Sequence, residues 1–243
     1  MPAGQSEDEK KPVPIRPAAS LLLVRDANDG DAHHGIEVLF LKRSLNMRFL
    51  PGYLAFPGGA LDPADAVLAN EHSMVEVSAQ ERAEDPAYAV AALRECAEEL
   101  GLVCAVSRTD GSMEDQVLTQ TEQQWLLNKD MSFAEYLRRH GLKLGGDRLR
   151  FVGRWVTPPH RNARFDTRFF LCAAHSKYDE FSVHPSELMW ARWGSPKALL
   201  EDIYAGREQA VRPTIAMLRA LSACHSVSDA LDHLHVPGPD PML

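Results

Sequence analysis

The sequence predicts one α/β or α+β domain of roughly 220 residues with flexible ends. Three observations lead to this class. Short runs rich in branched and aromatic residues, typical of β-strands, lie on both sides of well-marked helices. No Pro-, Gly- or Ser-rich linker divides the chain. No apolar run approaches the ~20 residues that a membrane-spanning helix requires.

The predicted strands are short and bounded by turn residues. A polar segment containing Asn28-Asp29-Gly30, a sequence typical of tight turns, separates the first two, so we expect them to form a hairpin. The third strand runs directly into Pro57-Gly58-Gly59. Strands are expected at residues 20–25, 36–43, 53–56, 103–106, 149–156, 167–173 and 188–193.

The predicted helices carry clear signals at their ends. Asp85 is a favourable N-cap, Pro86 suits the first helical position, and Gly101 suits a left-handed C-cap. Between them, residues 87–100 are rich in Ala, Leu and Glu, which favour helix formation. Capping boxes and prolines at the first helical position predict further helices at 132–141, 195–206 and 212–223.

Composition limits the classes of function. The 243 residues include 26 basic and 34 acidic side chains, which give a net charge of −8 and argue against a general nucleic-acid-binding protein. Four cysteines without paired spacing predict neither a disulfide framework nor a zinc site. We therefore expect a soluble protein of a reducing compartment, with cytoplasmic localisation.

The two ends are expected to lie outside the folded domain. Residues 1–17 contain four prolines and no apolar core, which predicts a flexible N-terminal tail rather than a signal peptide. The folded domain is expected at 18–223. Residues 224–243 are expected to form a C-terminal helix and tail.

One predicted helix carries an unusual acidic face. Glu95, Glu98 and Glu99 are spaced three and four residues apart, so their carboxylates share one side of the helix. They lie near its C-terminus, where the helix dipole disfavours each negative charge by up to ~1 kcal/mol. A solvated acidic surface is one interpretation. A divalent cation is the other, because converging carboxylate oxygens suit a hard ion such as Mg²⁺. An apolar stripe expected to pack inward contains Ala89, Leu93, Cys96 and Leu100.

This helix, together with the upstream Gly58-Gly59, resembles the Nudix box. The second half of that signature reads Arg-Glu-apolar-x-Glu-Glu-x-Gly-apolar, and residues 94–102 match it at every fixed position. The resemblance covers about residues 18–221 and implies a Nudix-type α/β/α sandwich with a mixed β-sheet and extra C-terminal helices. It also implies a Mg²⁺ or Mn²⁺ cofactor held by Glu95 and Glu99, with Glu98 either as a further ligand or as the residue that orients metal-bound water, and with Arg94 orienting a glutamate of the helix.

The spacing inside the box departs from the usual pattern. In the usual box a glycine precedes the arginine by 14 positions and a glutamate precedes it by eight. Here Gly59 precedes the arginine by 35 positions, which corresponds to an insertion of 21 residues. The position of the glutamate falls on Pro86, and the neighbouring Glu84 and Asp85 are candidates to replace it. The insertion, expected at about 62–85, is interpreted as a surface excursion or a lid.

A second motif concerns the substrate. Arg43, Arg48, Gly52 and Phe56-Pro57-Gly58-Gly59 have the spacing of a motif found in Nudix coenzyme A diphosphatases, although its second leucine and its threonine are missing here. The segment also contains Lys42 and no acid, which suits a substrate with a diphosphate and a 3′-phosphate. Taken alone, these cations equally fit ordinary charges at strand ends.

Two further features support the same resemblance. The insertion within the box, together with Trp155-Val156-Thr157-Pro158 and Arg164-Phe165-Asp166-Thr167-Arg168-Phe169-Phe170, resembles the Nudix 19 branch, whose members are coenzyme A and acyl-coenzyme A diphosphatases. A predicted loop near the middle of the chain offers basic residues that either contact phosphates or are plain surface charges, namely His160, Arg161, Arg164 and Arg168.

The resemblance implies hydrolysis of coenzyme A or acyl-coenzyme A to 3′-phospho-AMP and 4′-phosphopantetheine or its acyl form. The expected substrate-binding residues are Arg43, Arg48, Gly58 and Gly59, and Glu187 is a candidate for the general base. One alternative is a Nudix pyrophosphatase for ADP-ribose, NADH or another nucleoside diphosphate derivative. The other is a Nudix module that binds a nucleotide without hydrolysing it. The expected partner is a small diphosphate molecule rather than nucleic acid or a membrane, and a homodimer is the default expectation.

Overall fold

A mixed β-sheet forms the centre of the protein. The computed structural model describes residues 13–27, 35–75, 86–108, 110–113, 115–145, 149–174, 182–183, 186–236 and 238. Within these residues the main sheet has seven strands. They are β1 (Ile15–Asp26), β2 (Ile36–Arg43), β3 (Leu54–Ala55), β4 (Gly58–Ala60), β9 (Leu149–Val156), β10 (Arg164–Ala173) and β11 (Leu188–Gly194).

The order of the strands places β1 in the middle of the sheet. The path is β11-β2-β1-β10-β9, with β3 paired to β2 and β4 paired to β1. β1 and β10 run parallel, from Ile15 opposite Arg164 to Val24 opposite Ala173, whereas the other pairs are antiparallel. The prediction of a mixed sheet is therefore confirmed, and so is the antiparallel pairing of the first two strands.

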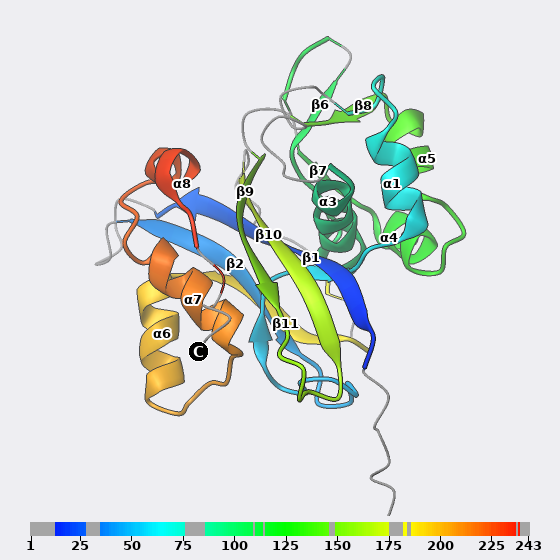
Figure 1. The fold of residues 1–243 in the computed structure, drawn as a ribbon. Helices are drawn as coiled ribbons and strands as arrows, with labels where there is room; N and C mark the ends of the chain where they lie inside the picture. Colours follow the sequence, from blue (N-terminus) through cyan, green and yellow to red (C-terminus); the bar gives the residue numbers. More distant parts are fainter. Residues whose placement is uncertain are drawn as a thin grey trace, which may run out of the picture.

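Helices cover both faces of this sheet (Figure 1). One group consists of α1 (Pro63–Ala69), α3 (Pro86–Leu100), α4 (Gln120–Leu127) and α5 (Phe133–Arg139). Two short strand pairs accompany it, β5 (Leu102–Val103) with β7 (Gln116–Val117) and β6 (Val106–Arg108) with β8 (Leu142–Leu144). The other group consists of α6 (Pro196–Tyr204), α7 (Arg212–Leu221) and α8 (Val227–His233).

Side chains of β1 alternate between two apolar cores because successive residues of a strand point to opposite faces. Leu21 and Leu23 pack with Leu93 of α3. Leu22 packs on the other face with Met217 of α7. The result is the three-layer α/β/α arrangement that was expected, with extra helices at the C-terminal end. None of the helices in the described ranges has the length and apolar character of a membrane span.

Three strands differ from the prediction by more than one residue at an end. β1 begins at Ile15, within the segment expected to be a tail, because its first residues pair with β10. β10 also begins earlier than expected, at Arg164. The single strand expected at 103–106 is divided into β5 and β6, since Ala105 has a φ of 51° and turns the chain.

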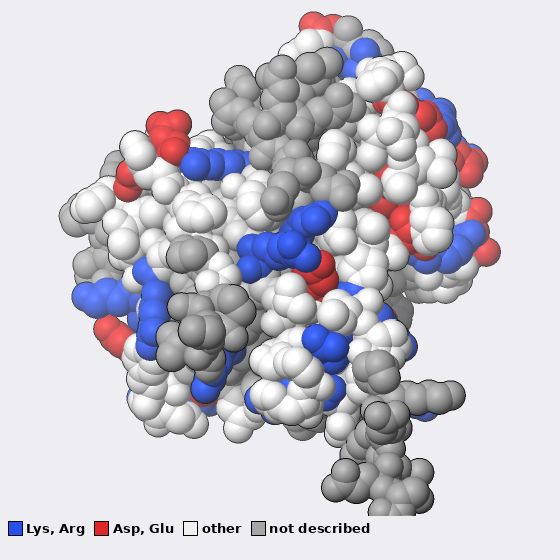
Figure 2. All heavy atoms as spheres, viewed as in Figure 1, with Lys and Arg blue, Asp and Glu red and all other residues white. Residues whose placement is uncertain are grey.

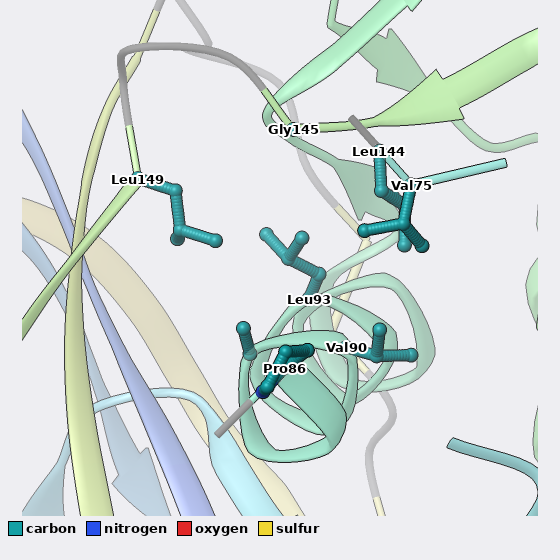
Figure 3. Close-up of a pocket in the computed structure, with 8 residues that line it drawn as sticks. Val75, Pro86, Val90, Leu93, Leu144, Gly145 and Leu149 are labelled. Carbon is teal, nitrogen blue, oxygen red and sulfur yellow. The ribbon is translucent and has the colours of Figure 1, made fainter. Parts of the chain in front are cut away.

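A small apolar cavity of about 10 Å³ lies beside α3 (Figure 3). Its lining includes Pro86, Val90 and Leu93 of the helix, and Leu149 of β9 faces them. These helix positions lie on the side opposite to the three glutamates, as the 3.6-residue period requires. The cavity therefore has no part in the acidic face.

Candidate active site

Two glycines bring β4 against the acidic face of α3. Gly59 lies opposite Ala19 of β1, and a Cβ atom at Gly59 would come within 2.5 Å of Cδ of Glu95. The N–H of Gly58 donates a hydrogen bond of 3.1 Å to Oε2 of Glu99. A Cβ atom at Gly58 would collide with the carbonyl oxygen of Ala19. Residues without a side chain therefore let the strand reach both carboxylates.

Arg94 holds the acidic face from within the protein. Its guanidinium is 6% exposed, and Nη1 donates to Oε1 of Glu95 and to Oε2 of Glu98, both at 2.9 Å. Nε and Nη2 donate to Oδ1 and Oδ2 of Asp65 at 2.8 and 3.1 Å, and Nη2 also donates to the carbonyl oxygen of Ala60 at 3.0 Å. Burial alone would lower the pKa of Arg94, but the hydrogen bond with Asp65 and the neighbouring carboxylates raise it above its ordinary value. Arg94 is thus placed to orient two glutamates of the helix.

Asp65 is a buried acid that contacts Arg94 and that the sequence motif did not single out. It lies in the first turn of α1 and is 2% exposed, whereas Glu84 and Asp85 lie outside the described residues. The usual box places its glutamate six positions after the glycine, and counting forward from Gly59 leads to Asp65. Counting backwards from Arg94 leads instead to Pro86 and misses this residue.

The two carboxyl groups nearest β4 are raised in pKa. Burial raises the pKa of Glu99 well above its usual range, and the charge of Glu95 raises it further; the hydrogen bond from Gly58 lowers it. Burial also raises the pKa of Glu95 to about 7, against the lowering effect of Arg94. The raised pKa values mean that the protein does not fully neutralise the negative charge of these two buried carboxylates. A bound cation would supply the missing positive charge.

Arg43 and Glu187 approach the same helix from the sheet. Arg43 is the last residue of β2 and lies opposite Leu188 of β11, which Glu187 precedes. The N–H of Ser44 donates to the carbonyl oxygen of Glu187 at 2.8 Å and joins the two segments. Both side chains act on Glu99, since the charge of Glu187 raises the pKa of that carboxyl and the charge of Arg43 lowers it. The structure thus brings these two predicted residues to the acidic helix.

Lys42 does not join this group, contrary to the basic patch that the sequence suggested. Adjacent strand residues point to opposite faces, so Lys42 points away from the side of Arg43. Its Nζ donates to Oε2 of Glu208 at 2.7 Å and lies 5.8 Å from the ring centre of Trp190. Arg48 is exposed on the loop that follows β2.

The basic residues near the β9–β10 turn have separate surroundings. His160 and Arg161 are exposed in the turn, and Nε of Arg164 donates to the carbonyl oxygen of Thr157 at 3.2 Å. The guanidinium of Arg168 lies 3.8 Å from the ring centre of Tyr88 on α3. The ring of Phe165 lies 5.4 Å from the ring of Phe49, centre to centre, so the turn and the loop after β2 are in contact.

Lys129 joins the site without any signal in the sequence. It follows α4, and its Nζ donates to Oε1 of Glu98 at 2.8 Å. Glu98 therefore accepts from Arg94 through one oxygen and from Lys129 through the other. The pair is separated by 31 residues, and nothing in the local sequence marks this turn as part of the site.

The residues fit a hard divalent cation, although they are not arranged around one. The donors are three carboxylates, Gly59 lets the strand lie directly against the carboxylate of Glu95, and two protein cations already bond to Glu98. Among the described residues, no group of three or more His, Cys, Asp or Glu side chains converges closely enough to hold a metal ion as it stands. Glu98 would have to give up the contact with Lys129 to offer Oε1 to an ion, whereas its Oε2 is held by Arg94.

Charges elsewhere on the surface are mixed. On the face shown in Figure 2, Lys and Arg lie in small groups with Asp and Glu near them. Arg154 of β9 and Asp166 of β10, for example, are joined by two hydrogen bonds of 2.7 Å. Among the residues described on this face there is no continuous basic stripe of the kind that nucleic-acid binding uses.

Comparisons with known proteins identify relatives of this chain. No family model matches it. The crystal structure of a NUDIX hydrolase from Alicyclobacillus acidocaldarius is 42% identical, with a TM-score of 0.82 over 92% of this chain and 98% of that one. Nudix hydrolase 7 of Caenorhabditis elegans is 26% identical over 185 residues, which are 76% of this chain and 55% of the worm protein. The chain thus spans about half the length of this curated relative.

Proposed function

Because this chain belongs to the Nudix hydrolase family, whose members act on phosphoric anhydrides, we propose that it cleaves the diphosphate linkage of coenzyme A or acyl-coenzyme A. The observation that carries this substrate is the position of Arg43. It belongs to the motif that resembles coenzyme A diphosphatases, and its charge acts on Glu99 of the acidic helix. A guanidinium beside a carboxylate metal site suits a diphosphate.

Glu95, Glu98 and Glu99 would hold Mg²⁺ or Mn²⁺, as is general for the family. When bound, such an ion polarises the phosphoryl oxygens and lowers the pKa of the attacking water. Arg94 keeps Glu95 and Glu98 in fixed orientations from the protein side. Gly58 and Gly59 keep the strand close to the carboxylates, because a Cβ atom at either position would collide with Glu95 or with the backbone of β1.

Arg43 would bind a phosphate oxygen at the site, and the exposed Arg48 would meet the 3′-phosphate further out. Glu187 is the proposed general base, because the charge of its carboxylate raises the pKa of Glu99 and its backbone carbonyl accepts from the N–H of Ser44. The expected products are 3′-phospho-AMP and 4′-phosphopantetheine, or its acyl form.

Product analysis tests the substrate. The protein with Mg²⁺ is incubated separately with coenzyme A, an acyl-coenzyme A, ADP-ribose and NADH, and the products are separated by chromatography. Release of 3′-phospho-AMP from the coenzyme A substrates alone supports the proposal. Release of AMP from ADP-ribose or NADH alone replaces it with the alternative pyrophosphatase activity. No product with either Mg²⁺ or Mn²⁺ favours a module that only binds nucleotides.

Two neighbouring cations provide a matched pair of variants. Arg43→Gln is expected to raise KM for coenzyme A by roughly ten-fold or more, since a charge-assisted hydrogen bond to phosphate is lost. Lys42→Gln removes a charge one residue away but on the other face of β2, so its KM should stay within about two-fold. Equal effects would show that Arg43 does not contact the substrate. Normal turnover of Glu99→Gln at saturating Mg²⁺ would contradict the metal assignment.

A further inference from the structure

Lys129 is held next to the acidic helix by more than its own side chain. It follows α4 with a φ of 62°, in the left-handed region that favours glycine and that other residues seldom adopt. Gln123 of the same helix is buried, and its Nε2 donates to the backbone carbonyl of Glu98 at 2.9 Å. Glu98 is therefore bonded twice from this part of the chain. Gln123 of α4 donates to the backbone carbonyl of Glu98, and Lys129, which follows α4, donates to the carboxylate of Glu98.

The two cations on Glu98 differ in how firmly they are held. Arg94 is 6% exposed and also bonds to Asp65, Ala60 and Glu95. The side chain of Lys129 is 56% exposed, and Glu98 is the partner of its ammonium. A half-exposed lysine pair contributes little stability and opens readily. Of the two cations, Lys129 is therefore the one that can leave.

We propose that Lys129 is a tethered counter-ion that competes with the divalent metal ion for Glu98. Its ammonium occupies a carboxylate oxygen that an oxygen-seeking ion would use. In the metal-free protein it offsets the charge of the acidic face; when an ion binds, the ammonium leaves Glu98 for solvent. The lysine thus sets how much free metal ion the protein needs before its site fills. This inference rests on the proposed metal site.

Direct binding of Mn²⁺ to the full-length protein, measured by electron paramagnetic resonance of the free ion without substrate, tests the competition. Lys129→Met is expected to lower the Kd for Mn²⁺ by roughly three- to ten-fold, because a competing positive charge is removed. Lys129→Gly should do the same, and it also suits the left-handed backbone, so a folding defect cannot account for agreement between the two. Lys197→Met, at an exposed position on α6, is the control and should leave the Kd unchanged.

Chemical labelling of the unmodified chain provides a second measurement. Acetylation of Lys129, followed by mass spectrometry with Lys197 as internal reference, should become faster when Mn²⁺ is added. A Kd that does not fall in either Lys129 variant, or a labelling rate that Mn²⁺ leaves unchanged, overturns the inference while the metal site stands. Failure of the parent protein to bind Mn²⁺ at all overturns the inference together with the proposed function.

Discussion

Replacing Asp65 by asparagine removes the charge that faces Arg94 while keeping the size of the side chain. Oδ2 of Asp65 accepts from Nη2 of Arg94 at 3.1 Å and from the N–H of Asp62 at 2.8 Å, and Oδ1 accepts from Nε of Arg94 at 2.8 Å. Both oxygens of Asp65 accept hydrogen bonds, so the amide nitrogen of an asparagine would face an N–H donor whichever oxygen it replaced. The aspartate and the guanidinium are 2% and 6% exposed, so water cannot replace the lost bonds.

The expected loss of unfolding free energy is about 2–4 kcal/mol. Breaking a buried ion pair from one side costs about 3–5 kcal/mol, and the lower figure applies here because Arg94 keeps Glu95, Glu98 and Ala60 as partners. Urea unfolding followed by circular dichroism measures this change. Asp62→Asn is the matched control at the N-cap of the same helix, where asparagine caps as well as aspartate does.

A second consequence separates the role of Asp65 in the site from its role in stability. Arg94 positions Glu95 and Glu98, so a loosened guanidinium should also weaken Mn²⁺ binding and lower kcat at temperatures where Asp65→Asn is fully folded. If the unfolding free energies of Asp65→Asn and Asp62→Asn differ by less than about 0.5 kcal/mol, Asp65 does not hold Arg94 in place and the prediction is wrong.

Three further substitutions test the glycines and the buried carboxyl. Gly59→Ala should fold but lose at least ten-fold in Mn²⁺ affinity, measured by electron paramagnetic resonance, because its Cβ would lie 2.5 Å from Cδ of Glu95. Gly58→Ala should fail to accumulate as folded protein in circular dichroism, since its Cβ meets backbone atoms that cannot move independently. Burial raises the pKa of Glu95 from 4.5 to about 7, so the unfolded chain ionises first and the metal-free protein loses up to about 3 kcal/mol as the pH rises through this range. Glu95→Gln should therefore be more stable than the parent in metal-free urea unfolding at pH 8, and this advantage should shrink towards pH 5; equal curves at both pH values would contradict the buried charge.

Sequence patterns predicted the apolar elements better than the polar ones. The prediction for β2 and β9 is confirmed at both ends, and so is the helix predicted to begin at Pro86 and to end before Gly101, which is α3. The first residues of β1 were missed because Arg16 and Pro17 are typical of a tail. Their place in the sheet comes from the parallel pairing with β10, a contact between distant segments that no local pattern records.

The site was predictable where its residues share one helix. Spacing alone put Glu95, Glu98 and Glu99 on one face, and α3 has them there. Lys42 was wrongly grouped with the substrate-binding cations, because counting the charges in a segment ignores that successive strand residues point to opposite faces. The contact of Lys129 with Glu98 could not be predicted from the sequence, because it depends on how α4 packs against α3 and on the backbone conformation of the turn after α4.

The parallel pairing of β1 with β10 also has a consequence for synthesis of the chain on the ribosome. β1 lacks its partner β10 until residue 173 has left the exit tunnel, although β4, α1 and α3 have been made by then. During this interval the edge of β1 that will pair with β10 is an unpaired edge of the nascent sheet, and such an edge promotes aggregation of the growing chain. Completion of the carboxylate site is thus expected late in translation, after most of its own residues have emerged.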